Sequence, residues 1–269
     1  MKSGQSVMPS SLSTQSLTSL PLSTKLNLEI QRAASRCLFV FFGPLMHLLF
    51  HVKFKYQVDN LKELRKQYKD LLKEAKGPVL VCTNHLTLID SIIQGVILSS
   101  IPNYLLHFRR LPWNLPEKKN FYHKLHWRMV CYLGKCIPVT RKASPKQAKE
   151  STDKMLYILN RGDLISIFPE GKRSRTGIVD DEDFSYGTGQ LLKSLPNTKV
   201  LCIYMRGIKN GGFANFPSKG ERFHLSMKMT TPTSELKGLR KVRDLSIQVI
   251  SEIKKMEEEY FEHEVSSRK

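Results

Sequence analysis

Short apolar runs that alternate with helical patterns are the feature that most restricts the fold of this chain. Each run holds four to seven residues, a length typical of a buried strand. This alternation predicts an α/β fold with a mixed, largely parallel sheet flanked by helices. The predicted strands are 79–82, 137–140, 164–168, 200–205 and 223–229, and the predicted helices are 91–99, 151–159, 189–195 and a long final helix from about Ser234.

The charge of the chain predicts an anionic partner. Its 269 residues carry a formal net charge of +19, and 41% of them are hydrophobic, enough to form a core. Such an excess attracts nucleic acid, an anionic membrane surface or phosphorylated substrates. Five cysteines, an odd number without CxxC pairs, indicate reduced thiols rather than disulfides or a zinc site.

The N-terminal part divides into two predicted segments. Residues 1–25 contain eleven Ser or Thr and no acid, so we expect a disordered leader; a cleaved transit peptide is the alternative, although the segment lacks arginine. Residues 26–56 are predicted to be a membrane-associating helical segment, an N-terminal apolar anchor. Residues 57–269 then form one α/β domain.

The anchor prediction depends on residues 37–52, which carry no formal charge and are flanked by Arg36 and Lys53. A helix of this length reaches about 24 Å, short of the roughly 30 Å hydrocarbon core. Gly43-Pro44 would also interrupt it, so a spanning helix is disfavoured. The segment is interpreted as an interfacial anchor, with a buried core helix as the alternative.

The first chemically informative stretch is PVLVCTNHLTLID, residues 78–90. In it a predicted buried strand is followed by His85, at a strand-to-helix junction where α/β proteins bind ligands. His85 and Asp90 would lie about 140° apart on one ideal helix, so they face each other only if His85 lies in the preceding turn. Asp90 could then accept from one imidazole nitrogen and leave the other free as a base.

The second stretch, PEGKRSRTG, follows the predicted strand 164–168. It combines Glu170, three cations and two glycines in nine residues. Glycines let the backbone approach an anion, and arginine binds phosphate with two parallel hydrogen bonds. We interpret it as a phosphate or oxyanion site; a solvated basic turn is the alternative.

Together these stretches resemble the motifs N-H-x-x-x-x-D and F-P-E-G-T-R-S of the glycerolipid and lysophospholipid acyltransferase superfamily. The resemblance covers roughly residues 75–230. Lys172 stands where threonine is usual and would add a cation. Arg141, after the apolar residues 137–139, resembles the arginine of a third family block that contacts the acceptor's phosphate.

The resemblance implies that a fatty acyl group moves from acyl-CoA or acyl-carrier protein to the hydroxyl of a phosphorylated lysolipid such as lysophosphatidic acid. We also expect a protein at the cytoplasmic face of a membrane, with membrane lipid as partner and with no cofactor, metal or nucleic acid. His85 would be the general base, oriented by Asp90. The implied substrate-binding residues are Arg141, Glu170, Gly171, Arg173 and Arg175.

The stretch 105–149 supports an anionic ligand independently, because it holds eleven Lys or Arg and one acid, Glu117. A basic membrane- or nucleic-acid-binding protein without catalysis is the alternative function, although no zinc-finger, RNP-like or basic-zipper pattern is present. A serine hydrolase is unsupported because G-x-S-x-G is absent. A metal phosphatase would have to combine His123 and His126 with the acids 180–183, and no recognised ligand spacing connects them.

Overall fold

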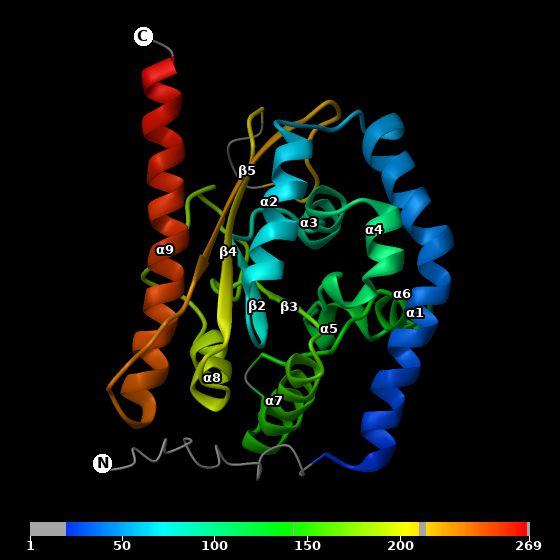
Figure 1. The fold of residues 1–269 in the computed structure, drawn as a ribbon, viewed down its shortest axis with the longest axis vertical. Coiled ribbons are helices and arrows are strands. Elements are labelled where there is room, and N and C mark those ends of the chain that lie inside the picture. The colour runs from blue at the N-terminus through cyan, green and yellow to red at the C-terminus, as the bar shows by residue number, and fades with distance from the viewer. Residues whose placement is uncertain (1–19, 142, 210–213, 268–269) are drawn as a thin grey trace, which may run out of the picture.

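A five-stranded sheet in the order β1-β5-β4-β2-β3 forms the centre of the computed structural model, which describes residues 20–141, 143–209 and 214–267 (Figure 1). Strand β4 pairs with β5 in antiparallel fashion, and the other three pairings are parallel. The predicted α/β fold with a mixed, largely parallel sheet is therefore confirmed. The strands are β1 (Gln57–Val58), β2 (Val79–Thr83), β3 (Ile165–Ile167), β4 (Lys199–Gly207) and β5 (Arg222–Thr230).

Helices cover both faces of the sheet. Side chains of α7, α8 and α9 pack on one face, and those of α2 and α3 on the other. Strand β2 alternates between the two cores, with Leu80 and Cys82 in one and Val79 and Val81 in the other, which explains its uninterrupted apolar sequence. The helices are α1 (Leu22–Leu48), α2 (Leu61–Glu74), α3 (Asp90–Leu98), α4 (Ile101–Leu106), α5 (Lys118–Phe121), α6 (Leu125–Leu133), α7 (Pro145–Asn160), α8 (Gly187–Ser194) and α9 (Gly238–Ser267), with a π-helical turn over Leu49–Lys53 and a 3₁₀ turn over Phe108–Arg110.

Helix α1 lies along one edge of the molecule, beside α4 and α6 (Figure 1). Polar contacts fix its position: Gln31 donates to the carbonyl oxygens of Tyr132 (2.9 Å) and Cys136 (3.0 Å), and Arg32 lies 2.9 Å from Asp163. The expected interruption at Gly43-Pro44 is wrong, because α1 continues through Pro44 and on into the π-helical turn.

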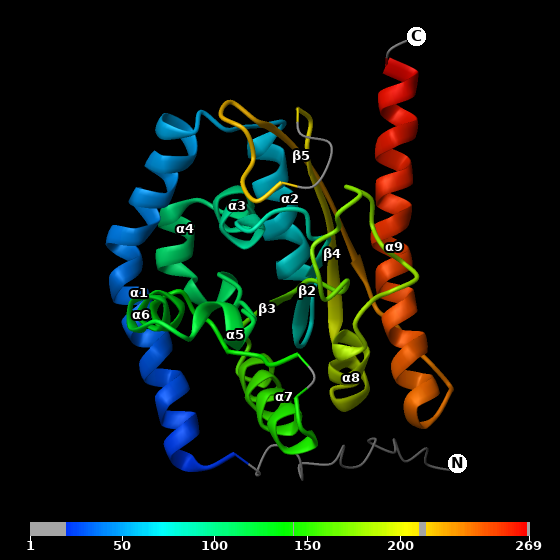
Figure 2. The same ribbon diagram turned by 180° about the vertical axis from the view of Figure 1, so that it is seen from behind.

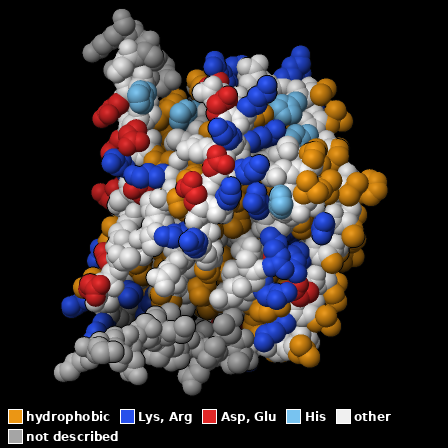
Figure 3. Space-filling view, in the orientation of Figure 1, with side chains coloured by type: hydrophobic (Ala, Val, Ile, Leu, Met, Phe, Trp, Pro, Cys, Tyr) orange, Lys and Arg blue, Asp and Glu red, His pale blue; other side chains and the backbone are white. Residues whose placement is uncertain are grey.

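The outer face of α1 is apolar and exposed. Figure 3 shows hydrophobic side chains along the edge of the molecule that α1 forms. Within the described ranges, Leu22–Lys53 is the one helix long and apolar enough to cross a membrane, and only 17% of its most apolar window is buried. The division into residues 1–25, 26–56 and 57–269 stays a prediction, and residues 1–19 of the predicted leader lie outside the described residues.

One predicted strand is wrong. Residues 137–140 form no strand and are joined to the chain near Asn114 and Glu117 by isolated bridges. Ile137 and Val139 donate to the carbonyl oxygens of Asn114 and Pro116, but Pro116 has no N–H to complete the ladder. Just before this segment, Lys135 is fully buried against Asp163 at 3.1 Å. Lys135 is therefore not one of the cations that the 105–149 stretch offers to a ligand.

Candidate active site

His85 lies in the turn between β2 and α3, and Asp90 is the first residue of α3. This is the placement that their five-residue spacing requires for the side chains to face each other. His85 Nδ1 and Asp90 Oδ2 are 2.9 Å apart. The hydrogen bond to Asp90 leaves Nε2 as the free ring nitrogen.

Backbone N–H groups of the turn just before α3 hold the Asp90 carboxylate. Its Oδ2 atom accepts from the N–H groups of Leu86 (2.7 Å) and Thr87 (2.8 Å), and its Oδ1 accepts from the Thr87 hydroxyl. The carboxylate is buried, with 2% of the residue exposed. Its position, and with it the orientation of the imidazole, is therefore fixed by the turn and by the start of α3.

The loop after β3 encloses His85. The Phe168 ring stacks on the imidazole with a centroid distance of 4.0 Å and an interplanar angle of 14°. Glu170 Oε1 accepts from the His85 N–H at 2.8 Å, and the Ser174 N–H donates to the His85 carbonyl at 2.8 Å. The two stretches singled out in the sequence therefore form one site.

Asn84 has a structural role in this turn. Its side chain donates to the Met205 carbonyl (2.9 Å) and accepts from the Met205 N–H (2.8 Å). The amide thereby continues the pairing of β2 with β4 by one step after β2 ends. This explains an asparagine immediately before His85 without giving it a part in the chemistry.

Glu170 is a buried carboxyl group with 3% of the residue exposed. Burial raises its pKa to about 7, and the negative charges of Glu257 and Asp180 act in the same direction. The N–H groups of His85 and Asp180 oppose this rise by donating to the carboxylate. Glu170 therefore changes charge close to neutral pH.

Gly171 allows the loop to turn directly after Glu170. Its φ is +67°, and an added Cβ atom would lie 2.9 Å from the Cβ of Ser185. Both observations require glycine at this position. The next residue, Lys172, lies 2.9 Å from Asp180 and 2.6 Å from Asp183, so its charge is neutralised within the loop and is not an additional cation for a ligand.

The three predicted arginines line the same cavity as His85. Arg173 is half-buried and donates to the Asn215 side chain at 2.8 Å, while Arg175 is exposed. Arg141 lies 3.2 Å from Glu117, with 62% of its side chain exposed. The structure thus brings all seven predicted site residues to the walls of one cavity or, for Asp90, directly behind them.

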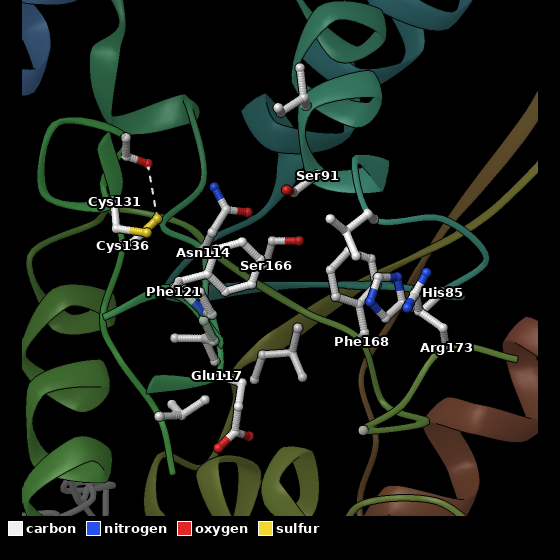
Figure 4. Close-up of a pocket in the computed structure, with 18 of the residues that line it drawn as sticks. His85, Ser91, Asn114, Glu117, Phe121, Cys131, Cys136, Ser166, Phe168 and Arg173 are labelled. Carbon is white, nitrogen blue, oxygen red and sulfur yellow. Dashed lines mark hydrogen bonds between the residues drawn. The ribbon is translucent and has the colours of Figure 1, made fainter. Parts of the chain in front are cut away.

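This cavity has a volume of about 1820 Å³ and combines charged and apolar walls. In Figure 4, His85, Phe168 and Arg173 lie at one side, and Asn114, Phe121 and the two cysteines Cys131 and Cys136 lie away from them. Apolar side chains of α1, α3 and α6 form much of the remaining wall. The arrangement suits a ligand with a long apolar part and an anionic group.

Sequence reasoning missed several contacts of this site. The Thr87 hydroxyl, three residues before Asp90, could have been recognised as a partner of that carboxylate from its spacing. Asn215 had no such signal, because it reaches Arg173 from 42 positions away. Among the described residues, no group of three or more His, Cys, Asp or Glu side chains is arranged to hold a metal ion.

Comparisons with known proteins show what this chain is similar to. Residues 53–231 match the model of the protein family described as Acyltransferase. No curated protein sequence matches the chain significantly. Among solved structures, the chain is similar to the 1-acyl-sn-glycerophosphate (LPA) acyltransferase PlsC from Thermotoga maritima, with a TM-score of 0.41 and 15% sequence identity, covering 87% of this chain and 97% of that chain.

Proposed function

The chain belongs to the acyltransferase family, and from this premise we propose that it transfers a fatty acyl group from acyl-CoA or acyl-carrier protein to the hydroxyl of a phosphorylated lysolipid such as lysophosphatidic acid. The observation that carries the proposal is the His85–Asp90 pair at the wall of a cavity with both cationic and apolar parts. The proposed chemistry needs no metal or cofactor, because a side chain supplies the base and the thioester is a co-substrate.

His85 is the proposed general base. Its Nδ1–H donates to Asp90, and its Nε2 takes the proton of the acceptor hydroxyl while that oxygen attacks the thioester carbonyl. The C–O bond forms, the C–S bond breaks, and the proton passes from the imidazolium to the departing sulfur. Asp90 keeps the ring in the required tautomer, as a carboxylate does in other His-based catalytic groups.

The loop after β3 is the proposed acceptor site. Arg173 and Glu170 position the acceptor, and Arg141 and Arg175 bind its phosphate, with Gly171 allowing the backbone to approach. Support comes from the shared cavity wall and from the short connection between Glu170 and the His85 backbone. Arginine is suited to this role because its planar fork binds phosphate with two hydrogen bonds.

The apolar part of the cavity is the proposed site of the acyl chains. The volume of about 1820 Å³ exceeds the roughly 300–1,000 Å³ that is usual for a small-molecule pocket. Phe39, Phe42 and Met46 of α1 and Ile92 of α3 line it. A hydrocarbon chain in this part would replace water with apolar contacts.

Helix α1 is the proposed contact with membrane lipid, at the cytoplasmic face. Its outward side chains include Phe41 and Leu48, which are 73% and 56% exposed, and Trp127 of the neighbouring α6 is 41% exposed. One side of α1 packs against α4 and α6, so the helix supports interfacial binding better than crossing, which would carry those helices into the bilayer.

The test is acyl transfer by the purified protein in mixed micelles. Radiolabelled acyl-CoA or acyl-carrier protein is offered with a panel of lysolipids that differ in headgroup, and the products are identified by mass spectrometry. We expect product with a phosphorylated lysolipid, formed at least about 100-fold more slowly by folded His85→Ala. Absence of transfer to every acceptor from both donors, with wild-type protein shown to be folded, would reject the proposal.

A further inference from the structure

Helix α9 presents one buried carboxylate to the loop of the candidate site. Glu257 is only 1% exposed, and both of its oxygens lie 3.1 Å from the N–H of Val179. Lys254 pairs with Glu257 at 2.9 Å and reaches the Val179 carbonyl at 3.4 Å. These two side chains therefore hold the N–H and the C=O of a single loop residue.

One peptide bond and two hydrogen bonds connect Val179 to His85 through two further residues, Asp180 and Glu170. The N–H of Asp180, next in the chain, donates to Glu170 Oε2 at 3.5 Å. Glu170 Oε1 in turn accepts from the His85 N–H at 2.8 Å. A shift of Val179 would therefore move the group that donates to Glu170, and with it the carboxyl group that lies against His85.

A second contact fixes the same loop. Arg206 of β4 donates to the Gly177 carbonyl at 2.6 Å, and its guanidinium lies 4.8 Å from the centre of the Phe261 ring of α9. Figure 2 shows the segment between β3 and α8 passing over β4 and reaching α9. The loop that carries the candidate acceptor site is thus stabilised by contacts that involve the C-terminal helix α9.

Attachment of α9 to the sheet does not require this carboxylate. Leu245, Val249 and Ile253 of α9 are 0–2% exposed and belong to the core on that face of the sheet. Burying a carboxylate is costly unless it is paired and hydrogen-bonded, and the backbone group that Glu257 binds is Val179. The arrangement therefore favours loop placement as the role of Glu257.

We propose that Glu257 is a positioning residue, which holds Val179 so that Glu170 and Arg173 stay at the cavity wall beside His85. The inference rests on the proposed function and extends it to α9, which lies beyond the residues 53–231 that match the family model. The charge of Glu257 acts through the loop and touches neither the acceptor nor the thioester.

The first test compares Glu257→Ala and Glu257→Gln with Glu258→Ala, a matched control at an exposed neighbouring carboxylate. Hydrogen bonds to charged groups are stronger than neutral ones, so we expect Glu257→Ala to lower kcat/KM for the acceptor about 10-fold, equivalent to about 1.4 kcal/mol. The donor's KM should stay unchanged. Glu257→Gln keeps one acceptor oxygen and should recover part of the loss, while Glu258→Ala should match the wild type.

The second test measures the loop without using activity. Trypsin cuts after Lys172, Arg173 and Arg175, and mass spectrometry of the fragments gives the rate at each bond. We expect Glu257→Ala to raise these rates about 10-fold or more over Glu258→Ala, because cleavage follows the population of the opened loop. If Glu257→Ala does not fold, the same cleavage rates are measured on Glu257→Gln.

The two tests separate the inference from the proposed function. Unchanged cleavage at these bonds in both Glu257 variants would overturn the inference whatever the activity. Faster cleavage with an inactive wild type would uphold the loop placement and reject the acyl transfer. An active wild type together with fully active, folded Glu257→Ala would overturn the inference alone.

Discussion

Replacing Glu170 by glutamine removes a buried group whose charge changes near neutral pH. Its pKa is raised from 4.5 to about 7, chiefly because burial disfavours the carboxylate. Between these two values the folded protein binds a proton that the unfolded chain has already lost. The favourable contribution of Glu170 to folding is therefore fully present below about pH 4.5, falls as the pH rises, and is lost above about pH 7.

The size of the effect follows from the two pKa values. One unit of pKa difference corresponds to about 1.4 kcal/mol, so the whole loss is about 3 kcal/mol. About 2.5 kcal/mol of this falls between pH 5 and pH 8. Glutamine has the same shape and does not titrate, so the free energy of unfolding of the wild type should fall by about this amount relative to Glu170→Gln over that interval.

The measurement is urea unfolding at pH 5, 6, 7 and 8 in a constant concentration of detergent, with the free energy extrapolated linearly to zero urea. Glu258→Gln changes an exposed carboxyl group and should follow the wild type. Parallel pH profiles for wild type and Glu170→Gln would refute the reasoning. They would mean that the N–H groups of His85 and Asp180 keep Glu170 ionised despite its burial.

Elements with local signals could be predicted from the sequence. The two-faced burial of β2 follows from its uninterrupted apolar residues, and the position of His85 before α3 follows from its spacing to Asp90. Membership of an acyltransferase family, predicted from the two motifs, is confirmed by the family match over residues 53–231. The catalytic and substrate-binding roles of the residues stay predictions.

Other features depend on tertiary contacts that the local sequence does not encode. Gly43-Pro44 was expected to interrupt a helix, but buried residues support the helix on both sides of Pro44, such as Ser35 in α1 and Phe50 in the π-helical turn that follows it. Lys172 resembled a ligand-binding cation, but Asp180 and Asp183 fold back onto it. The course of the helix and the pairing of the lysine were each decided by contacts with residues that a local sequence pattern does not identify.

The contact of Glu257 with Val179 joins residues 78 positions apart. Nothing in a predicted amphipathic helix distinguishes a charged residue that faces a loop from one that faces solvent. The regular apolar positions of α9, including Val249 and Ile253, gave the helix and its buried face. They did not give the polar contact that reaches the candidate site.

The remaining predictions concern the base, the acceptor's phosphate and the membrane. His85→Ala should lower the single-turnover rate of acyl transfer about 100-fold to 10,000-fold without changing the thermal unfolding midpoint, and a rate near that of the wild type would reject His85 as the base. Arg173→Ala should raise the acceptor's KM about 10-fold and leave the donor's KM unchanged in steady-state assays, with a smaller effect for the exposed Arg141→Ala; a donor effect alone would reverse the assignment. Flotation with anionic liposomes at low and high salt tests the membrane contact of α1, because apolar insertion persists at high salt whereas charge attraction is screened. Phe41 and Leu48 are exposed, so changing both to Ser costs little folding energy but removes about 1.5–3 kcal/mol of apolar burial per side chain at the membrane. The wild type should therefore float in high salt and the double variant should not; equal flotation of the two would mean that the outer face of α1 does not insert.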